Sequence, residues 1–311
     1  MKYYLAPMEG IAGYIYRNSY EKIFHNIDKY FTPFIPTTKS KSLKTKELKD
    51  VLPENNKDIN IVPQIITNDS EGFSNLSEKL QQLGYNEVNL NLGCPVKTVV
   101  SKNRGSGFLA RREELDIFLD EIFKRDSMKI SIKTRIGKNN PEEFYELIKI
   151  YNKYPIQELI IHPRTQKDFY GNKPNLEVFK DALSLSTNPV CYNGDIFTVD
   201  DYDKLIKAFP EVKTVMFGRG ILANPGLINE IENNVFMDKE VLKNFHDEIL
   251  NKYIELFNED RNAMFKMKEL WKYMIYIFSD NKKYAEKIKK SQKLSDYKEV
   301  VSNLFMEQEI M

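Results

Sequence analysis

Up to about residue 235, short apolar runs with polar residues at alternate positions recur along the chain, and each run predicts a β-strand. The runs lie at residues 3–6, 29–34, 61–66, 87–92, 129–134, 158–161, 189–192 and 214–217. Between several of them, apolar side chains recur at helical spacing, at residues 75–83, 112–123, 141–151 and 199–208. Strands that alternate with helices in this way predict an α/β fold, a parallel (β/α)8 TIM barrel.

After about residue 235 the alternating runs stop and helical spacing continues alone. Helices rich in Lys, Glu, Leu and aromatic residues are predicted at residues 241–257, 261–278, 281–290 and 296–305. Ser295 is a suitable N-cap for the last of them. The sequence therefore predicts a catalytic (β/α)8 barrel over residues 1–235 and a small all-α helical domain over residues 236–311.

Amino-acid composition says less about the class of protein than the pattern of predicted strands and helices does. The 311 residues can bury a large core, and 46 basic residues against 45 acidic ones leave a formal net charge of +1, so only local clusters of charge could indicate RNA. Two distant cysteines and three histidines give neither a disulfide framework nor metal-ligand spacing, which predicts a reducing compartment and no metal. Without a signal sequence or a membrane-spanning run, we expect a soluble cytoplasmic protein and no membrane partner.

Polar and turn-forming residues stand at the C-terminal ends of the predicted strands. In a (β/α)8 barrel these ends face one mouth, where active sites lie. The residues at these ends are Pro7, Met8, Glu9, Gln64, Asn91, Cys94, Lys133, Arg135, His162, Arg164, Asn193, Gly194, Asp195, Gly218 and Arg219. We therefore expect a ring of polar groups around one pocket.

Two of these strand ends are rich in glycine. Asn193-Gly194-Asp195 and Gly218-Arg219-Gly220 follow the seventh and eighth strands, where barrels commonly bind phosphate because glycine lets backbone N–H groups approach an anion. Ordinary turns are the alternative for either motif alone, but the pair predicts a phosphorylated ligand. Lys133 and Arg135 share one strand face, and a lysine at a barrel mouth can neutralise an anionic or electron-rich ligand.

Cys94 and His162 are the strand-end residues whose side chains can exchange protons near neutral pH. Cys94 follows its strand in a Gly-Cys-Pro sequence, and a small buried apolar side chain is the alternative to a reactive thiol. Cys191 lies inside its strand and is most simply part of the core. The strand-end position of His162 favours a ligand contact over a structural role, whereas His25 and His246 are expected to be structural.

Two lysine-rich segments are candidates for contacts with a polyanion. One is the segment 39–46, and the predicted helical domain adds Lys282, Lys283, Lys287, Lys289, Lys290 and Lys293. Each segment could be a solvated helix face, but two of them near one pocket suit RNA. Tyr14, Tyr16 and Tyr170 could then stack on a base that has been taken out of the folded RNA.

Six motifs, in order and spacing, resemble those of the tRNA-dihydrouridine synthases, and the resemblance covers most of the chain. They are Ala6-Pro7-Met8-Glu9-Gly10, Leu90-Asn91-Leu92-Gly93-Cys94-Pro95, Lys133-Thr134-Arg135, His162-Pro163-Arg164-Thr165, Asn193-Gly194-Asp195 and Gly218-Arg219-Gly220. Many family members have glycine where this chain has Pro163, a difference that leaves the histidine and arginine of that motif in place.

The resemblance implies an FMN-dependent reduction of uridine in tRNA to dihydrouridine, with NADPH as the electron source. It implies that Cys94 is the general acid at uracil C5 while reduced FMN delivers hydride to C6. It places the FMN phosphate at the turns around Asn193 and Gly218-Arg219. The remaining cofactor contacts that we assign are Pro7, Met8, Glu9, Gln64, Lys133, His162, Gly194 and Asp195. The RNA contacts that we assign are Asn91, Arg135, Arg164, Lys287 and Lys290.

Two other functions stay open on the sequence alone. A flavin-dependent barrel dehydrogenase acting on a free pyrimidine or a related small molecule would explain the pocket but not the lysine-rich segment near the C-terminus. A non-catalytic RNA-binding protein on a barrel scaffold would not explain Cys94, Lys133 and His162 together. The pattern selects neither the uridine position nor NADPH over NADH, and a monomer is the simplest expectation.

Overall fold

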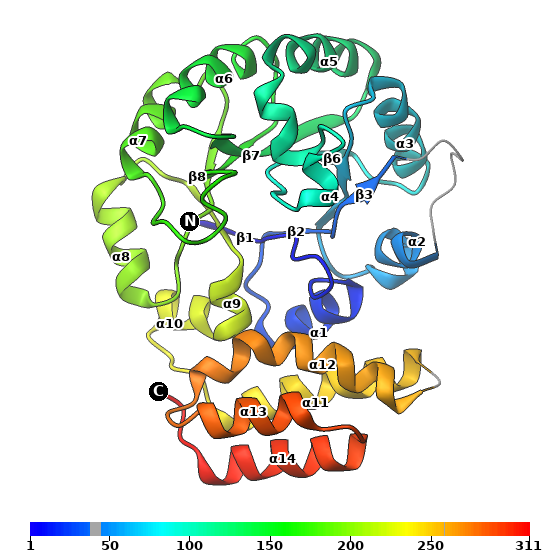
Figure 1. Ribbon diagram of the computed structural model, residues 1–311, viewed down its shortest axis with the longest axis vertical. Helices are drawn as coiled ribbons and strands as arrows, with labels where there is room; N and C mark the ends of the chain where they lie inside the picture. The colour runs from blue at the N-terminus through cyan, green and yellow to red at the C-terminus, as the bar shows by residue number, and fades with distance from the viewer. Residues whose placement is uncertain (38–44, 258) are drawn as a thin grey trace. The chain divides into compact units, whose positions relative to one another are not determined.

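The computed structural model describes residues 1–37, 45–257 and 259–311 (Figure 1). In these ranges the strands form one sheet in the order β3-β5-β6-β7-β8-β9-β10-β1-β2-β4. The pairs β1–β2, β2–β4, β3–β5 and those from β5 through β10 run parallel. The strands are β1 (Lys2–Leu5), β2 (Lys29–Phe31), β3 (Ile35–Pro36), β4 (Ile61–Val62), β5 (Gln64–Ile66), β6 (Glu87–Leu92), β7 (Lys129–Gly137), β8 (Leu159–Thr165), β9 (Val190–Tyr192) and β10 (Thr214–Phe217).

The sheet closes on itself at Pro63. This residue alone separates β4, which pairs with β2, from β5, which pairs with β6. Proline has no N–H to donate, so the ladder is interrupted there, but the Pro63 carbonyl still accepts from the Asn89 N–H at 2.9 Å. Residues 61–66 therefore act as one strand that pairs with β2 through its first half and with β6 through its second half, which closes the sheet. The protein is a (β/α)8 barrel with a helical C-terminal part, as the alternation along the sequence predicted.

The helices follow the predicted apolar spacing closely. Strands β6 and β10 and helix α8 (Val199–Ala208) have the predicted bounds, whereas β7 and β8 were predicted too short because their parallel pairing continues past Arg135↔His162. The other helices among the barrel strands are α2 (Thr45–Val51), α3 (Ser70–Gln82), α4 (Lys97–Val100), α5 (Arg112–Arg125), α6 (Phe144–Tyr151) and α7 (Leu176–Leu185), with the 3-10 turns η1 (Pro53–Asn55), η2 (Gly105–Ala110) and η3 (Pro141–Glu143).

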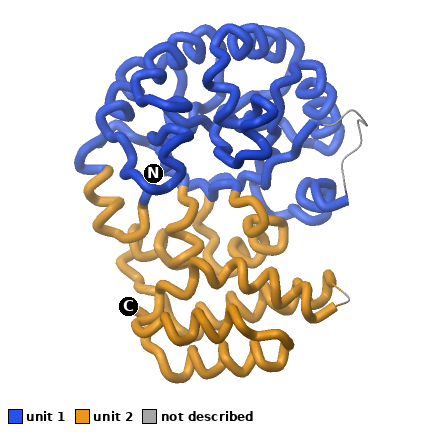
Figure 2. The backbone as a smooth tube through the Cα atoms, viewed as in Figure 1, with its two compact units in different colours: residues 1–7, 28–195, 206–216 blue, residues 8–27, 196–205, 217–311 orange. Residues whose placement is uncertain are grey.

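The chain forms two compact units (Figure 2). Unit 1 consists of residues 1–7, 28–195 and 206–216, and it holds the strands up to Met216. Unit 2 consists of residues 8–27, 196–205 and 217–311. It contains α1 (Tyr14–Phe24), α9 (Arg219–Ala223), α10 (Leu227–Asn233), α11 (Lys239–Leu256), α12 (Asp260–Met274), η4 (Ile275–Ile277), α13 (Lys282–Lys290) and α14 (Leu294–Glu307). The domain boundary at residue 235 stays a prediction.

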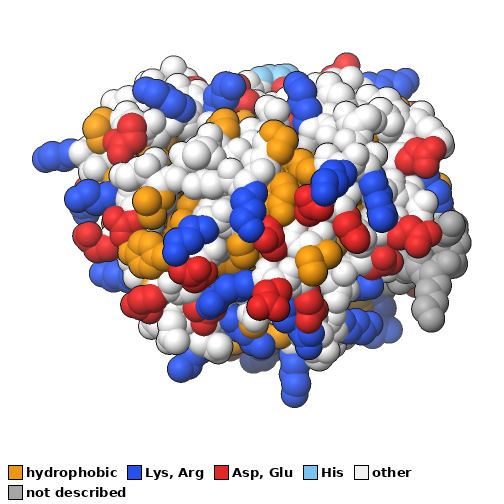
Figure 3. Space-filling model, turned by 90° about the horizontal axis from the view of Figure 1, so that it is seen from above, with side chains coloured by type: hydrophobic (Ala, Val, Ile, Leu, Met, Phe, Trp, Pro, Cys, Tyr) orange, Lys and Arg blue, Asp and Glu red, His pale blue; other side chains and the backbone are white. Residues whose placement is uncertain are grey.

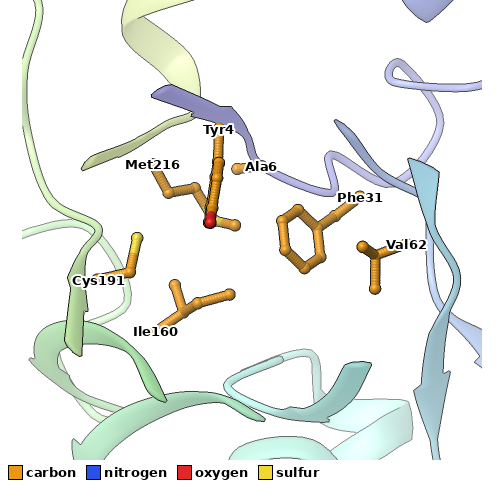
Figure 4. Close-up of a cluster of buried hydrophobic side chains, with 7 residues drawn as sticks. All are labelled: Tyr4, Ala6, Phe31, Val62, Ile160, Cys191 and Met216. Atoms are coloured by element: carbon orange, nitrogen blue, oxygen red, sulfur yellow. The ribbon is translucent and has the colours of Figure 1, made fainter. Parts of the chain in front are cut away.

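Seven buried side chains form a hydrophobic cluster in unit 1 (Figure 4). They come from β1 and the residue after it, and from β2, β4, β8, β9 and β10, and they converge in the close-up: Tyr4, Ala6, Phe31, Val62, Ile160, Cys191 and Met216. Burial raises the pKa of the Cys191 thiol well above its usual value, so this thiol stays neutral. Cys191 is a core residue, as predicted.

A directed chain of hydrogen bonds lies in the core of unit 2. Trp271 Nε1 can only donate, so Tyr297 Oη accepts from it at 2.7 Å and donates its own proton to His246 Nε2, also at 2.7 Å. The His246 ring then carries its proton on Nδ1, which donates to Asp247 Oδ1 at 2.8 Å. Burial lowers the pKa of His246, which keeps the ring neutral. The buried position agrees with the structural role expected for this histidine.

Helix α14 begins earlier than the sequence suggested. Lys293 occupies its N-cap position, and Ser295 lies inside the helix with its hydroxyl donating to Asp296 Oδ1 at 3.2 Å. The prediction that Ser295 caps this helix was therefore wrong. Ser295 is already inside the first turn of the helix, so its side chain does not occupy the N-cap position.

Charge is mixed on the molecular face shown in Figure 3, where lysine and arginine side chains are interspersed with aspartate and glutamate. Within the described ranges, no helix combines the length and the apolar composition that crossing a bilayer requires. A basic surface for RNA must therefore be sought in particular segments of the chain.

Candidate active site

A row of hydrogen-bonded side chains crosses the barrel interior of unit 1. Asn91 Nδ2 donates to Gln64 Oε1 at 2.7 Å, and Gln64 Nε2 donates to Asn89 Oδ1 at 2.7 Å. Asn89 Nδ2 in turn donates to Ser131 Oγ at 2.9 Å. All four side chains are buried, and buried amides are stabilising only when their polar atoms are paired. The row therefore holds Asn91 in one orientation at the end of β6.

Asn91 in turn fixes the backbone at Cys94. Its Oδ1 accepts from the N–H groups of Gly93 and Cys94, at 3.0 and 2.9 Å. The Cys94 carbonyl accepts from the Ser106 N–H at 3.1 Å and from Ser106 Oγ at 2.8 Å. Gly105 has a φ of +55°, and a Cβ there would lie 2.8 Å from the Cys94 carbonyl oxygen, so only glycine fits. Cys94 is half-buried and lies just after the strand end, as predicted.

The amine of Lys133 has no bonding partner among the described residues of unit 1. It lies on β7 opposite Asn91 of β6 in the strand register. Among the residues that the structure describes, none makes a hydrogen bond or an ion pair with Lys133 Nζ. Burial, together with the charge of Arg135, lowers the pKa of this amine to about 8. A half-buried amine that the protein leaves unpaired is suited to an anionic or electron-rich ligand.

Arg135 holds three segments of backbone together. Its Nε donates to the Gly93 carbonyl at 2.9 Å, its Nη1 to the Thr165 carbonyl at 2.8 Å and its Nη2 to the Phe169 carbonyl at 2.9 Å. The guanidinium also lies 5.6 Å from the centroid of the Tyr170 ring, within cation–π range. The side chain is 1% exposed, so it connects the Cys94 loop to the loop after β8. Its predicted contact with RNA stays a prediction.

Arg164 forms a buried ion pair that also sets the state of His162. Arg164 Nη1 donates to Asp195 Oδ1 at 2.9 Å, and Nη2 donates to Asp195 Oδ2. The same Nη1 lies 3.1 Å from His162 Nε2. A guanidinium has no acceptor, so Nε2 must accept, and the imidazole is neutral with its proton on Nδ1. The pair thus orients His162 as a donor through Nδ1.

The turn after β9 is shaped by close packing in unit 1. Asn193 Nδ2 donates to the Met216 carbonyl at 2.8 Å, which ties the end of β9 to β10. A Cβ at Gly194 would lie 2.1 Å from Tyr192 Oη, so this position requires glycine. Asp195 follows directly and is engaged by Arg164. The phosphate contact predicted for this turn stays a prediction.

The corresponding turn after β10 lies in unit 2. A Cβ at Gly220 would lie 1.9 Å from the Ile196 carbonyl oxygen, so the backbone of these two segments approaches too closely for any side chain. Arg219 is half-buried, and its guanidinium lies 5.3 Å from the centroid of the Phe197 ring. Gly218 precedes it at the N-cap position of the short helix α9.

The residues after β1 are divided between the units. Pro7 ends the first segment of unit 1, and Met8 and Glu9 begin unit 2. Pro7 and Met8 are half-buried and Glu9 is exposed. The Met8 carbonyl accepts from the N–H groups of Ile11 and Ala12, at 3.1 and 2.9 Å, which forms the turn before α1. The flavin contacts expected of Pro7, Met8 and Glu9 stay predictions.

Of the expected RNA contacts, the lysines of α13 are exposed. Lys287 Nζ lies 5.5 Å from the centroid of the Tyr284 ring, and Lys290 Nζ lies 3.4 Å from Glu286 Oε2 in an exposed pair. The basic segment 39–46 lies outside the described residues except for its last two positions. These lysines are therefore available to an anion in unit 2, but their role stays a prediction.

Of the three aromatic side chains expected to contact RNA, Tyr16 is buried, Tyr14 is half-buried and Tyr170 is exposed. Tyr16 is 1% exposed and packs against Tyr20 and Phe245 in the core of unit 2, so the expectation that it stacks on RNA was wrong. Tyr170 is 48% exposed, and its ring lies 6.1 Å from that of His162. Tyr170 therefore remains a candidate for stacking on a base.

Three positioning residues were missed by the sequence reasoning. Asn89 and Ser131 lie two residues before Asn91 and Lys133, so strand alternation already puts them on the same face. Ser106 lies between two glycines, and its hydroxyl anchors the Cys94 carbonyl. Polar residues at every second position of an otherwise buried strand were the signal for the first two.

Comparison with known proteins gives consistent matches. Residues 4–310 match the family model described as Dihydrouridine synthase (Dus). The chain is 28% identical over 265 residues to the "Probable tRNA-dihydrouridine synthase 2" of Bacillus subtilis (strain 168), covering 82% of this chain and 78% of that protein. It is 28% identical over 247 residues to the "tRNA-dihydrouridine(16) synthase" of Vibrio vulnificus (strain CMCP6), covering 75% and 76%.

Among solved structures, morphinone reductase in complex with tetrahydroNAD superposes with a TM-score of 0.53 at 11% identity, covering 78% of this chain and 90% of that one. A likeness at this identity concerns the fold, and it agrees with the barrel described above.

Proposed function

Since this chain belongs to the dihydrouridine synthase family, we propose that it reduces uridine in tRNA to 5,6-dihydrouridine with a bound flavin and a nicotinamide reductant, namely FMN and NADPH. The observation that carries the proposal is Lys133, whose amine has no bonding partner among the described residues. Lys133 lies opposite Asn91 in the strand register, and Asn91 fixes the backbone of Cys94. An amine placed in this way suits an electron-rich ring, and a thiol at the neighbouring strand end suits proton transfer.

The residues of unit 1 fit the cofactor. Lys133 offers a positive charge at the barrel interior, and His162 carries its proton on Nδ1 as a donor. We assign the flavin ring to these two residues with Gln64, and the phosphate to the turns around Asn193 and Gly218-Arg219. When bound and reduced, FMN would supply the hydride that is added to uracil C6.

Cys94 supplies the second hydrogen in this proposal. Hydride addition at C6 places negative charge toward C5, and C5 must then gain a proton before the saturated ring is released. The Cys94 S–H bond breaks, a C–H bond forms at C5, and the resulting thiolate is reprotonated from solvent. The bonds from Asn91 and Ser106 hold the backbone of Cys94, from which the thiol projects, in one position.

The RNA side of the proposal rests on local charge, because the chain as a whole is nearly neutral. Lys287 and Lys290 are exposed on α13, where they can neutralise phosphates. Tyr170 is exposed next to His162 and can stack on a uracil that has left the RNA stack. A free pyrimidine, which carries no phosphates, would not need the exposed lysines.

The pKa of Lys133 gives a test of cofactor binding. The amine is charged below a pH of about 8 and neutral above it, so attraction to an electron-rich ring is present at pH 7 and lost as the pH rises through that value. We expect the affinity of the apoprotein for FMN to fall by up to about tenfold per pH unit above that point. The affinity at each pH between 7 and 10 is measured by the quenching of FMN fluorescence when the apoprotein binds it.

The Lys133→Met variant is the control for this titration. It should bind FMN more weakly at pH 7, and its affinity should vary less with pH than that of the wild-type protein. Identical pH slopes for the two proteins would show that another group titrates and that Lys133 does not contact the flavin.

A further inference from the structure

Helix α12 of unit 2 presents an exposed aromatic ring beside two cations. Phe265 is 43% exposed, and Arg261 and Lys268 lie on the same helix face, four residues before it and three after it. The Arg261 guanidinium carbon and the Lys268 amine each lie 5.3 Å from the centroid of the Phe265 ring. The core of the unit is built from the opposite side of the helix, by Ala263, Met264, Met267, Leu270, Trp271 and Met274.

Lys268 joins this face to the lysine-rich helix α13. Its amine donates to the carbonyl of Lys289 at 3.1 Å and to the carbonyl of Ser291, at the C-terminal end of α13. These bonds satisfy carbonyls that the helix end leaves open, and they fix Lys268 beside the Phe265 ring. The exposed lysines at the end of α13 therefore belong to the same surface as Phe265.

Charge on these two helices differs from the balance of the whole chain. In residues 260–293 the acidic side chains are Asp260, Glu269, Asp280 and Glu286. The basic side chains of that segment are Arg261, Lys266, Lys268, Lys272, Lys282, Lys283, Lys287, Lys289, Lys290 and Lys293. An excess of cations around an exposed ring is complementary to a polyanion that also carries flat, stackable groups.

We propose that Phe265 is a stacking platform for an unpaired base of the bound RNA, while Arg261 and the lysines of α13 contact the phosphates on either side of that base. This inference rests on the proposed tRNA substrate and adds a contact outside the barrel. Every base has a π-face, so a ring of this kind binds single-stranded nucleotides with little dependence on sequence. The neighbouring cations supply the part of the affinity that depends on salt.

Binding of an unmodified tRNA transcript to Phe265→Ala and Phe265→Trp, measured over a range of salt concentrations, tests the proposal. Phe265→Ala should weaken binding by about tenfold, the usual effect of losing one stacked base, while the slope of log affinity against log salt stays the same. Phe265→Trp keeps a stacking ring, so its affinity for the tRNA should remain close to that of the wild-type protein. Arg261→Gln should instead reduce the salt slope, since it removes a phosphate contact.

Phe236→Ala is the matched control, because Phe236 is 70% exposed in the same unit but lies outside α12 and α13. Its tRNA affinity should equal that of the wild-type protein. The unfolding midpoint of Phe265→Ala shows whether this variant is folded. The stacking platform is refuted if the folded variant binds tRNA like the wild type. It is also refuted if Phe236→Ala weakens binding as much as Phe265→Ala does. Dihydrouridine formation by the wild-type protein is measured in the same preparation. If dihydrouridine forms but the platform is refuted, only this inference fails. If no dihydrouridine forms, the proposed function itself fails.

Discussion

Replacing Cys94 with alanine should leave FMN binding and reduction by NADPH intact but slow the tRNA-dependent reoxidation of the flavin by roughly 10²- to 10⁴-fold. Neither of the first two steps needs an acid at C5. The third does, because the ring cannot leave with negative charge at that carbon. The magnitude is the usual contribution of a general acid that is held in position.

Rapid mixing resolves the two half-reactions, so the defect can be assigned to one of them. Cys191→Ala removes the other cysteine thiol, which is fully buried in the barrel core, and its reoxidation rate should match that of the wild-type protein. Wild-type reoxidation of Cys94→Ala on tRNA would mean that another group supplies the proton.

Replacing Arg164 with methionine should lower the free energy of unfolding by about 3 kcal/mol. The change keeps an unbranched apolar side chain but leaves Asp195 without its cationic partner and His162 without its donor. Arg164 is 1% exposed and Asp195 30%, so the carboxylate regains part of its hydration and the loss falls at the lower end for broken buried ion pairs.

Urea unfolding of three proteins measures this effect. Lys149→Met breaks an exposed ion pair with Glu146 on α6 and should leave the midpoint nearly unchanged. Arg164→Lys keeps the charge but cannot bind both carboxylate oxygens in the same way, so it should fall between the wild type and Arg164→Met. An Arg164→Met midpoint equal to that of Lys149→Met would show that the pair does not stabilise the barrel.

The positions of the strand ends could be predicted well from the sequence. The buried alternation of residues 87–92 stops at Gly93 and Pro95, which fixed both the end of β6 and the place of Cys94. β8 was predicted too short because the proline after His162 suggests a break. In the structure, β7 and β8 stay paired beyond that point. The partner of β8 there is a strand distant in sequence, so the local sequence of β8 does not indicate the pairing.

The side-chain partners could be predicted less well. Alternation placed Lys133 and Arg135 on one strand face, but it could not show that Arg135 would bind three carbonyls from two distant loops. Tyr16 was misjudged although Tyr20 follows it at helical spacing, and both rings pack in the core of unit 2. Contacts between segments distant in sequence determine these outcomes, and a single sequence does not specify them.

The measurement that tests the account most directly is nucleoside mass analysis of an unmodified tRNA transcript after incubation with the purified FMN-bound protein and NADPH. We predict that uridine at particular positions gains two hydrogens, that the gain requires both the protein and NADPH, and that it is lost in Cys94→Ala. A flavin-loaded protein that oxidises NADPH and reduces a free pyrimidine while leaving the tRNA unchanged would contradict the account.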